Sequence, residues 1–165
     1  MPASWMRHST PQEHAMPTVT LSTYLRITRA SALFDVLVVA PFATPWSFQL
    51  LYPQLDRLNL SMGGAALPPF AQLHILITCL MGSLVLLWSV RRLLEPSLAL
   101  GRYDGAGRFL FATWMLWALA QGGLPLVWLF LVPELLWGVA QWWPVAPSRS
   151  ARRGNRPGLK LVHAS

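Results

Sequence analysis

Residues 70–90 read FAQLHILITCLMGSLVLLWSV, a run without a formal charge that ends at Arg91 and Arg92. A helix needs about 20 apolar residues to cross a bilayer, and this run is long enough. The composition agrees, because 54% of the 165 residues are hydrophobic and only 12% are charged. Soluble proteins carry roughly 25% charged residues, so these charges are too few to coat a soluble globule, and the apolar content excludes a disordered chain. The sequence therefore predicts an integral membrane protein.

Three further apolar runs complete a set of four predicted spans. They are residues 122–143, interrupted by Glu134, residues 105–121, with Arg108 near the start, and residues 30–48, which contain Asp35, Pro41 and Pro45. A tight turn at residues 121–125 joins the last two spans, which should therefore form an antiparallel hairpin. Because lipid offers the backbone no hydrogen-bond partner, we expect helices. We predict an all-α fold, an integral membrane four-helix bundle with antiparallel up-down topology.

The segments around these spans carry their own signals. A helix starting near Ser22 can precede the first span, and it should kink at Pro41 or Pro45. Residues 49–60 have leucines at helical intervals, which suits a helix on the outer membrane surface. The segment 101–107, GRYDGAG, matches no nucleotide-binding motif, and we expect a flexible cytoplasmic loop there.

Basic residues gather on one side of the predicted spans. With a cytoplasmic N-terminus, that side holds all 13 Lys and Arg residues except Arg57. Because cytoplasmic loops are enriched in Lys and Arg, we predict that both termini lie in the cytoplasm. The net charge of +7 then reports orientation rather than a nucleic-acid partner.

The predicted transmembrane domain, residues 22–143, lies between two tails that we expect to be disordered, residues 1–21 and 144–165. The second tail is basic, with Arg149, Arg152, Arg153, Arg156 and Lys160. These residues lack the aromatic neighbours of an RNA-binding module. We expect them to contact anionic lipid headgroups instead.

Glu134 is the charged residue whose position most needs an explanation. It lies about ten residues from either end of its span, hence roughly 15 Å deep. An acidic residue at that depth costs about 2.5–3.5 kcal/mol, so it should face the bundle, be protonated or be paired. Gly138 and Gln141 continue the same helix face. Two interpretations are open, namely a proton-accepting or ligand-binding carboxyl and a structural hydrogen bond between helices.

Asp35 and Arg108 are the other two candidates for a catalytic or binding role. Arg108 enters its span from the cytoplasmic side, and its side chain can extend toward the cytoplasm. An ion pair with Asp35 would lower the cost of holding either residue in lipid. Asp104, four residues before Arg108, offers a competing local pair. The pair is either architectural or part of one site with Glu134.

His74 is a candidate for cofactor binding, although a lone histidine near the end of a span is more often an interfacial donor. No second histidine or cysteine lies at metal-ligand spacing, so we predict neither a metal site nor a cofactor. The single cysteine, Cys79, excludes a disulfide within the chain. Together with Gly82 and Ser83 it forms a small-residue face suited to packing against a neighbouring helix.

Three stretches of the chain resemble the small bacterial DoxX-like and BphX-like membrane proteins. They are FDVLVVAPFATPW, HILITCLMGSLVLLWSVRRL and LGRYDGAGRFLFATWMLWALAQGGLPLVWLFLVPELLWGVAQ, over roughly residues 30–143. The resemblance implies a bacterial inner-membrane protein with four short spans and both ends inside, and some members of the group are implied as membrane partners of oxidoreductases. None of the three stretches is a catalytic motif.

Two classes of function follow from the sequence. The first is a structural or accessory protein of a membrane complex, with a second copy or another membrane protein as its partner. The second is a membrane-embedded enzyme or carrier for a lipophilic small molecule, in which Glu134 acts as acid and base with Asp35 or Arg108 in support. The absence of a catalytic motif favours the first, and whether the protein is an enzyme stays open.

Overall fold

The computed structural model describes residues 17–147, a chain of helices joined by short connections. The five long helices are α1 (Leu21–Val39), α2 (Pro45–Ser61), α3 (Gln72–Leu94), α4 (Leu98–Ala120) and α5 (Trp128–Trp142). Two single turns, η1 (Ala40–Phe42) and η2 (Pro125–Val127), precede α2 and α5. Within the described residues there is no strand, only an isolated bridge between Val19 and Val145. The prediction of an all-α fold is confirmed, whereas the basic tail residues 149–160 lie outside the described residues.

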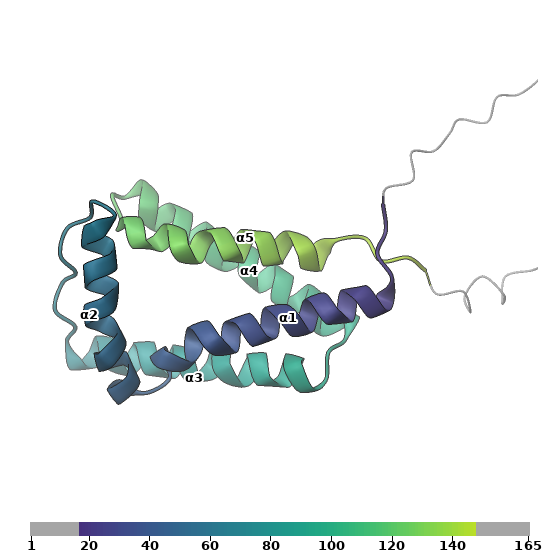
Figure 1. Cartoon of the computed structure of the whole chain (residues 1–165), viewed down its shortest axis with the longest axis horizontal. Helices are drawn as coiled ribbons and strands as arrows, with labels where there is room; N and C mark the ends of the chain where they lie inside the picture. The colour runs from purple at the N-terminus through teal and green to yellow at the C-terminus, as the bar shows by residue number, and fades with distance from the viewer. Residues whose placement is uncertain (1–16, 148–165) are drawn as a thin grey trace, which may run out of the picture.

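Four of the helices, α1, α3, α4 and α5, pack as two pairs. α3 packs along α1, and α5 packs along α4, while α3 and α4 make little direct contact. Figure 1 shows the two pairs converging where the described ends of the chain lie and diverging toward α2, which crosses the wide end. The bridge fixes both ends of this part of the chain together, since Val19 N donates to Pro144 O at 2.9 Å and Ala146 N donates to Val19 O at 2.8 Å.

A sharp bend separates α1 from α2. The axes of the two helical segments differ by 97°, and the break at residues 43–44 is flanked by Pro41 in η1 and Pro45 at the start of α2. Thr44 caps α2, because its Oγ1 accepts a hydrogen bond from Ser47 N at 3.2 Å. The expected kink is therefore present, and the predicted span 30–48 covers the second half of α1, η1 and the start of α2. The first long helix begins at Leu21 and ends at Val39, because proline cannot continue it.

The bend packs closely against α3 at Gly82. A Cβ on this residue would lie 2.6 Å from the carbonyl oxygen of Phe42, so only glycine allows the approach. Beside it, Ser83 Oγ donates to Ala43 O at 3.2 Å, and Cys79 is buried one turn earlier. The small-residue face of α3 thus serves to seat the bend between α1 and α2.

The glycine-rich segment 101–107 is helical, and the prediction of a loop there is wrong. α4 begins at Leu98, where Ser97 Oγ accepts a hydrogen bond from Leu100 N at 3.1 Å. Gly105 lies against α5, since a Cβ on it would be 2.6 Å from Trp142 Cδ1, and Gly101 lies against Tyr24 of α1. Gly101 and Gly105 are therefore close-packing positions that bring α4 near both neighbours rather than points of flexibility.

Two stretches of helix are long and apolar enough to cross a membrane, namely Gln72–Leu94 and Pro125–Trp142. The bent pair, Leu21–Phe42 with Pro45–Ser61, is a third if it is counted as one broken span. α4 carries Arg102, Asp104 and Arg108 in its first half, and it is not among these stretches. Length and composition thus indicate a membrane protein with two or three candidate spans.

Candidate functional site

Arg92, near the end of α3, lies at the centre of a buried polar cluster. Its side chain is fully buried. Nη2 binds the carboxylate of Asp35 on α1, and Nη1 donates to Asp104 Oδ2 on α4 at 2.5 Å. The same guanidinium donates to the hydroxyl groups of Ser31 and Ser89, each at 3.2 Å. One side chain therefore joins α1, α3 and α4 through charged and neutral hydrogen bonds.

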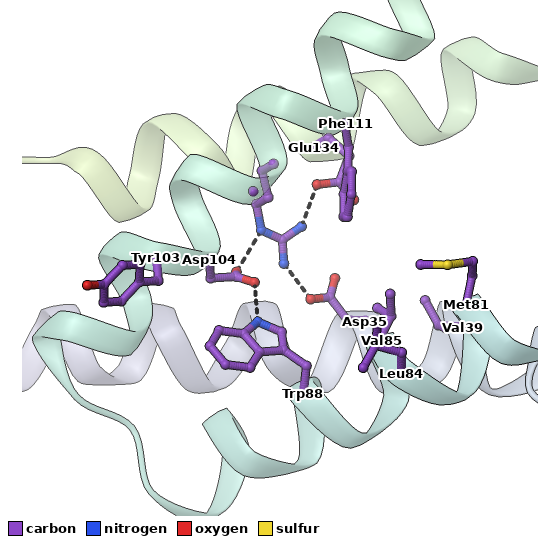
Figure 2. A pocket seen from close by; sticks show the side chains of 12 residues that line it. Asp35, Val39, Met81, Leu84, Val85, Trp88, Tyr103, Asp104, Phe111 and Glu134 are labelled. Carbon is purple, nitrogen blue, oxygen red and sulfur yellow. Dashed lines mark hydrogen bonds and ion pairs between the residues drawn. The ribbon is translucent and has the colours of Figure 1, made fainter.

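Arg108 forms a second centre and connects α4 to α1 and α5. Its Nη2 donates to Asp35 Oδ2 at 2.5 Å, its Nε to Asp104 Oδ2 at 2.9 Å and its Nη1 to Glu134 Oε2 at 3.0 Å. Figure 2 shows the three carboxylates arranged around this guanidinium. The expected pair with Asp35 and the competing pair with Asp104 are both formed. The Arg108 side chain does not extend out of the bundle, because only 3% of it is exposed.

Two further side chains donate hydrogen bonds to the Asp104 carboxylate. Gln141 of α5 is fully buried, and its Nε2 donates to Asp104 Oδ2 at 2.8 Å and to Ser31 Oγ at 2.7 Å. The indole Nε1 of Trp88 donates to Asp104 Oδ1 at 3.0 Å, as Figure 2 shows. Asp104 thus has four side-chain donors, more than Asp35 or Glu134, which satisfies the hydrogen-bonding needs of a buried carboxylate.

The cluster holds more negative than positive charge. Its ion pairs join three carboxylates, Asp35, Asp104 and Glu134, to two guanidiniums, Arg92 and Arg108, which leaves a formal charge of −1. The two aspartates each contact both arginines, whereas Glu134 contacts Arg108 alone. The Glu134 side chain is 19% exposed, against 8–9% for the aspartates. The least compensated carboxylate is therefore at the edge of the cluster.

Glu134 and Asp35 face two adjoining cavities between the helix pairs. The larger has a volume of about 740 Å³ and is lined by residues of α1, η1, α3, α4 and α5, nearly all of them apolar. The smaller, of about 330 Å³, also borders Asp104 and Arg108. Six lining residues are common to both cavities, namely Asp35, Val39, Met81, Val85, Phe111 and Glu134. The charge cluster is therefore the polar wall of a mainly apolar space.

The structure brings together three of the four residues singled out in the sequence. Asp35, Arg108 and Glu134 contact one another through the guanidinium of Arg108. His74 lies apart from them in the first turn of α3, where its ring packs against Phe70 with centroids 5.8 Å apart. Among residues 17–147, no group of three or more His, Cys, Asp or Glu side chains is arranged to hold a metal ion.

Arg92 is the central residue that sequence reasoning missed. As the neighbour of Arg91 it was counted among the cytoplasmic basic residues that set orientation. The signal that identifies it is the spacing of the buried positions on α3, which are Cys79, Gly82, Ser89 and Arg92. These positions continue the small-residue face at helical intervals, so the last of them points toward the bundle.

No protein-family model, curated protein or solved structure matches this chain. The resemblance to DoxX-like and BphX-like proteins stays a prediction. The geometry of the cluster and its cavities therefore carries the functional argument.

Proposed function

We propose that this chain is an integral membrane protein that binds a lipophilic small molecule between its helices, with the carboxylate of Glu134 as the polar anchor. The observation that carries the proposal is the cavity of about 740 Å³, which is apolar apart from Thr78, Asp35 and Glu134. Sites for small molecules have volumes of roughly 300–1,000 Å³, apolar walls and a few converging polar groups. The larger cavity has each of these properties.

The apolar outer surface of the helices supports the proposal that they lie in a membrane. On α3, Leu80, Leu84 and Leu87 are 60–70% exposed, and soluble monomers rarely expose such continuous apolar surface. In the proposed arrangement α1, α3, α4 and α5 cross the bilayer, and α2 lies along one face of it. Asp104 and Arg108 of α4 then face the bundle interior, where ionisable residues of membrane helices normally lie.

The orientation of this bundle follows from its charges. Within the described part of the chain, every Lys or Arg except Arg57 lies in the half of α1, α3 or α4 nearer the end where Val19 pairs with Val145. That end is the cytoplasmic one by the usual enrichment in Lys and Arg, and the membrane is proposed to be a bacterial inner membrane.

The cavity is accessible from the side of the bundle. Ile77, Met81, Phe111 and Leu129 line it and are each 44–49% exposed. The first two belong to α3, and Phe111 belongs to α4, the two helices that make little direct contact. A lipophilic molecule can therefore pass between α3 and α4 directly from the bilayer, without crossing water.

Within the site, Glu134 and Asp35 have different roles. Asp35 binds both arginines and belongs to the network that joins the helices, whereas Glu134 is free on one side to contact a ligand or exchange a proton. The other candidate function, an accessory protein of a membrane complex, is supported by the same network, which needs no ligand to explain it. Membership of the DoxX-like or BphX-like group is compatible with either function.

Native mass spectrometry of the protein released from its own membrane tests the proposal. The matched variants are Val85→Trp, which fills the wall common to both cavities, and Leu87→Trp, which adds the same ring to the exposed face of the same helix. We expect a small molecule on the wild-type protein and on Leu87→Trp, and its loss from Val85→Trp at unchanged thermal stability. A cavity that is empty in all three, with a protein subunit bound instead, would support the accessory function.

A further inference from the structure

We infer that the ligand of this cavity carries a cationic head, a protonated amine, on an apolar body. The inference rests on the proposed function and adds the chemical class of the ligand. It starts from the formal charge of −1 in the cluster of Asp35, Asp104, Glu134, Arg92 and Arg108.

The excess negative charge lies on the cavity wall. Glu134 Oε2 accepts a hydrogen bond from Arg108 Nη1 at 3.0 Å. Its contact with Arg108 uses Oε2 alone, so the second oxygen, Oε1, has no hydrogen-bond partner among residues 17–147, and the side chain borders both cavities. A carboxylate oxygen that faces an apolar space is an acceptor prepared for a donor that the protein does not supply.

The cavities contain no other cation that could compensate this charge. Among the described residues, no Lys, Arg or His lines the larger cavity, and Arg108 is the single basic residue on the smaller one. An uncompensated charge away from water is costly, so it is neutralised by a proton or by a bound cation. A ligand with an ammonium group supplies both the charge and the hydrogen-bond donor.

The remaining walls suit the body of such a ligand. Phe34, Phe42 and Phe130 lie along the larger cavity, with the rings of Phe42 and Phe130 edge to face at 6.3 Å. Aromatic faces attract cations and pack well against hydrocarbon. Met81 and Met115 add flexible side chains that adjust to different shapes. An anionic head would instead meet a site that is already negative.

Three probes with twelve carbon atoms each test the inference, namely dodecylammonium, dodecanol and dodecanoate. Each is titrated at pH 7 into the full-length protein in phosphatidylcholine nanodiscs, with binding followed by the methyl resonance of Met115. A charge-assisted hydrogen bond is expected to make the ammonium probe bind at least about tenfold more tightly than the alcohol, with dodecanoate weakest. The comparison among probes uses the wild-type protein, so it does not depend on the folding of any variant.

Glu134→Gln and Glu95→Gln form a matched pair for the same titration. Glu95 is an exposed acid beyond the end of α3, paired with Arg91, and its neutralisation should leave the preference for ammonium intact. Glu134→Gln should reduce that preference to about twofold, because the amide offers the ammonium group no negative charge. Equal binding of ammonium and alcohol by the wild-type protein would overturn the cationic ligand and leave the lipophilic site standing. If Val85→Trp failed to weaken any probe, the site itself would be overturned.

Discussion

Replacement of Arg92 by methionine removes the central cation of the cluster while keeping an apolar stem of similar length. Asp35 and Asp104 then have only Arg108 as a charged partner. Breaking a buried ion pair from one side costs about 3–5 kcal/mol, because a charge is left unpaired. The two lost hydrogen bonds to carboxylates, at about 1.5–3 kcal/mol each, give a similar range. Total stabilities of roughly 5–15 kcal/mol make this a large fraction of the free energy of unfolding.

Arg91 provides the matched control, since it is the preceding residue on the same helix. Its ion pair with Glu95 is solvent-exposed, with 54% and 68% of the side chains accessible, and such pairs contribute about 0–1 kcal/mol. Thermal unfolding in detergent, followed by tryptophan fluorescence, should show Tm lowered by about 6–20 °C in Arg92→Met and by less than about 4 °C in Arg91→Met. Equal shifts in the two variants would refute the claim that the cluster holds the helices together.

Two other predictions concern packing and topology. Gly105→Ala should lower the thermal stability, because the new Cβ would lie 2.6 Å from Trp142 Cδ1. In Gly107→Ala the new Cβ meets no atom within 4 Å, so this variant should raise the free energy of unfolding by up to about 1 kcal/mol through helix propensity. A Gly105→Ala variant more stable than the wild type would contradict the close packing of α4 on α5. The bridge between Val19 and Val145 predicts that reporters fused to the two termini lie on the same side of the membrane, and reporters on opposite sides would contradict the fold.

The helices that were predicted well are those that a long apolar run or a proline break marks in the sequence. The uncharged run at 70–90 became α3, and the prolines at 41 and 45 marked the break in the first helix. The contact between Asp35 and Arg108 was also predictable, because two opposite charges at similar depth have few other partners in a membrane.

The residues that the sequence failed to place are those whose environment depends on the rotation of a helix about its axis. Arg91 and Arg92 are adjacent and chemically identical, yet consecutive residues differ by about 100° around a helix. One of them is therefore exposed and the other is fully buried. Gly105 was misjudged for a related reason, since a glycine that permits a loop also permits two helices to approach. Whether such an arginine is exposed or buried, and whether such a glycine lies in a loop or between helices, depends on the neighbouring helices. The composition of the chain does not show which helices are neighbours.

Methyl NMR of the methionines tests the central claim, the lipophilic site between the helix pairs, most directly. Met81 and Met115 line the larger cavity, whereas Met62 is exposed just beyond the end of α2. With protein labelled at the methionine methyl groups in deuterated detergent, protons of bound dodecylammonium should give nuclear Overhauser effects to Met81 and Met115 and none to Met62. These effects should disappear in Val85→Trp. Effects of equal size at all three methyl groups, unchanged by that substitution, would show non-specific adsorption and contradict the account.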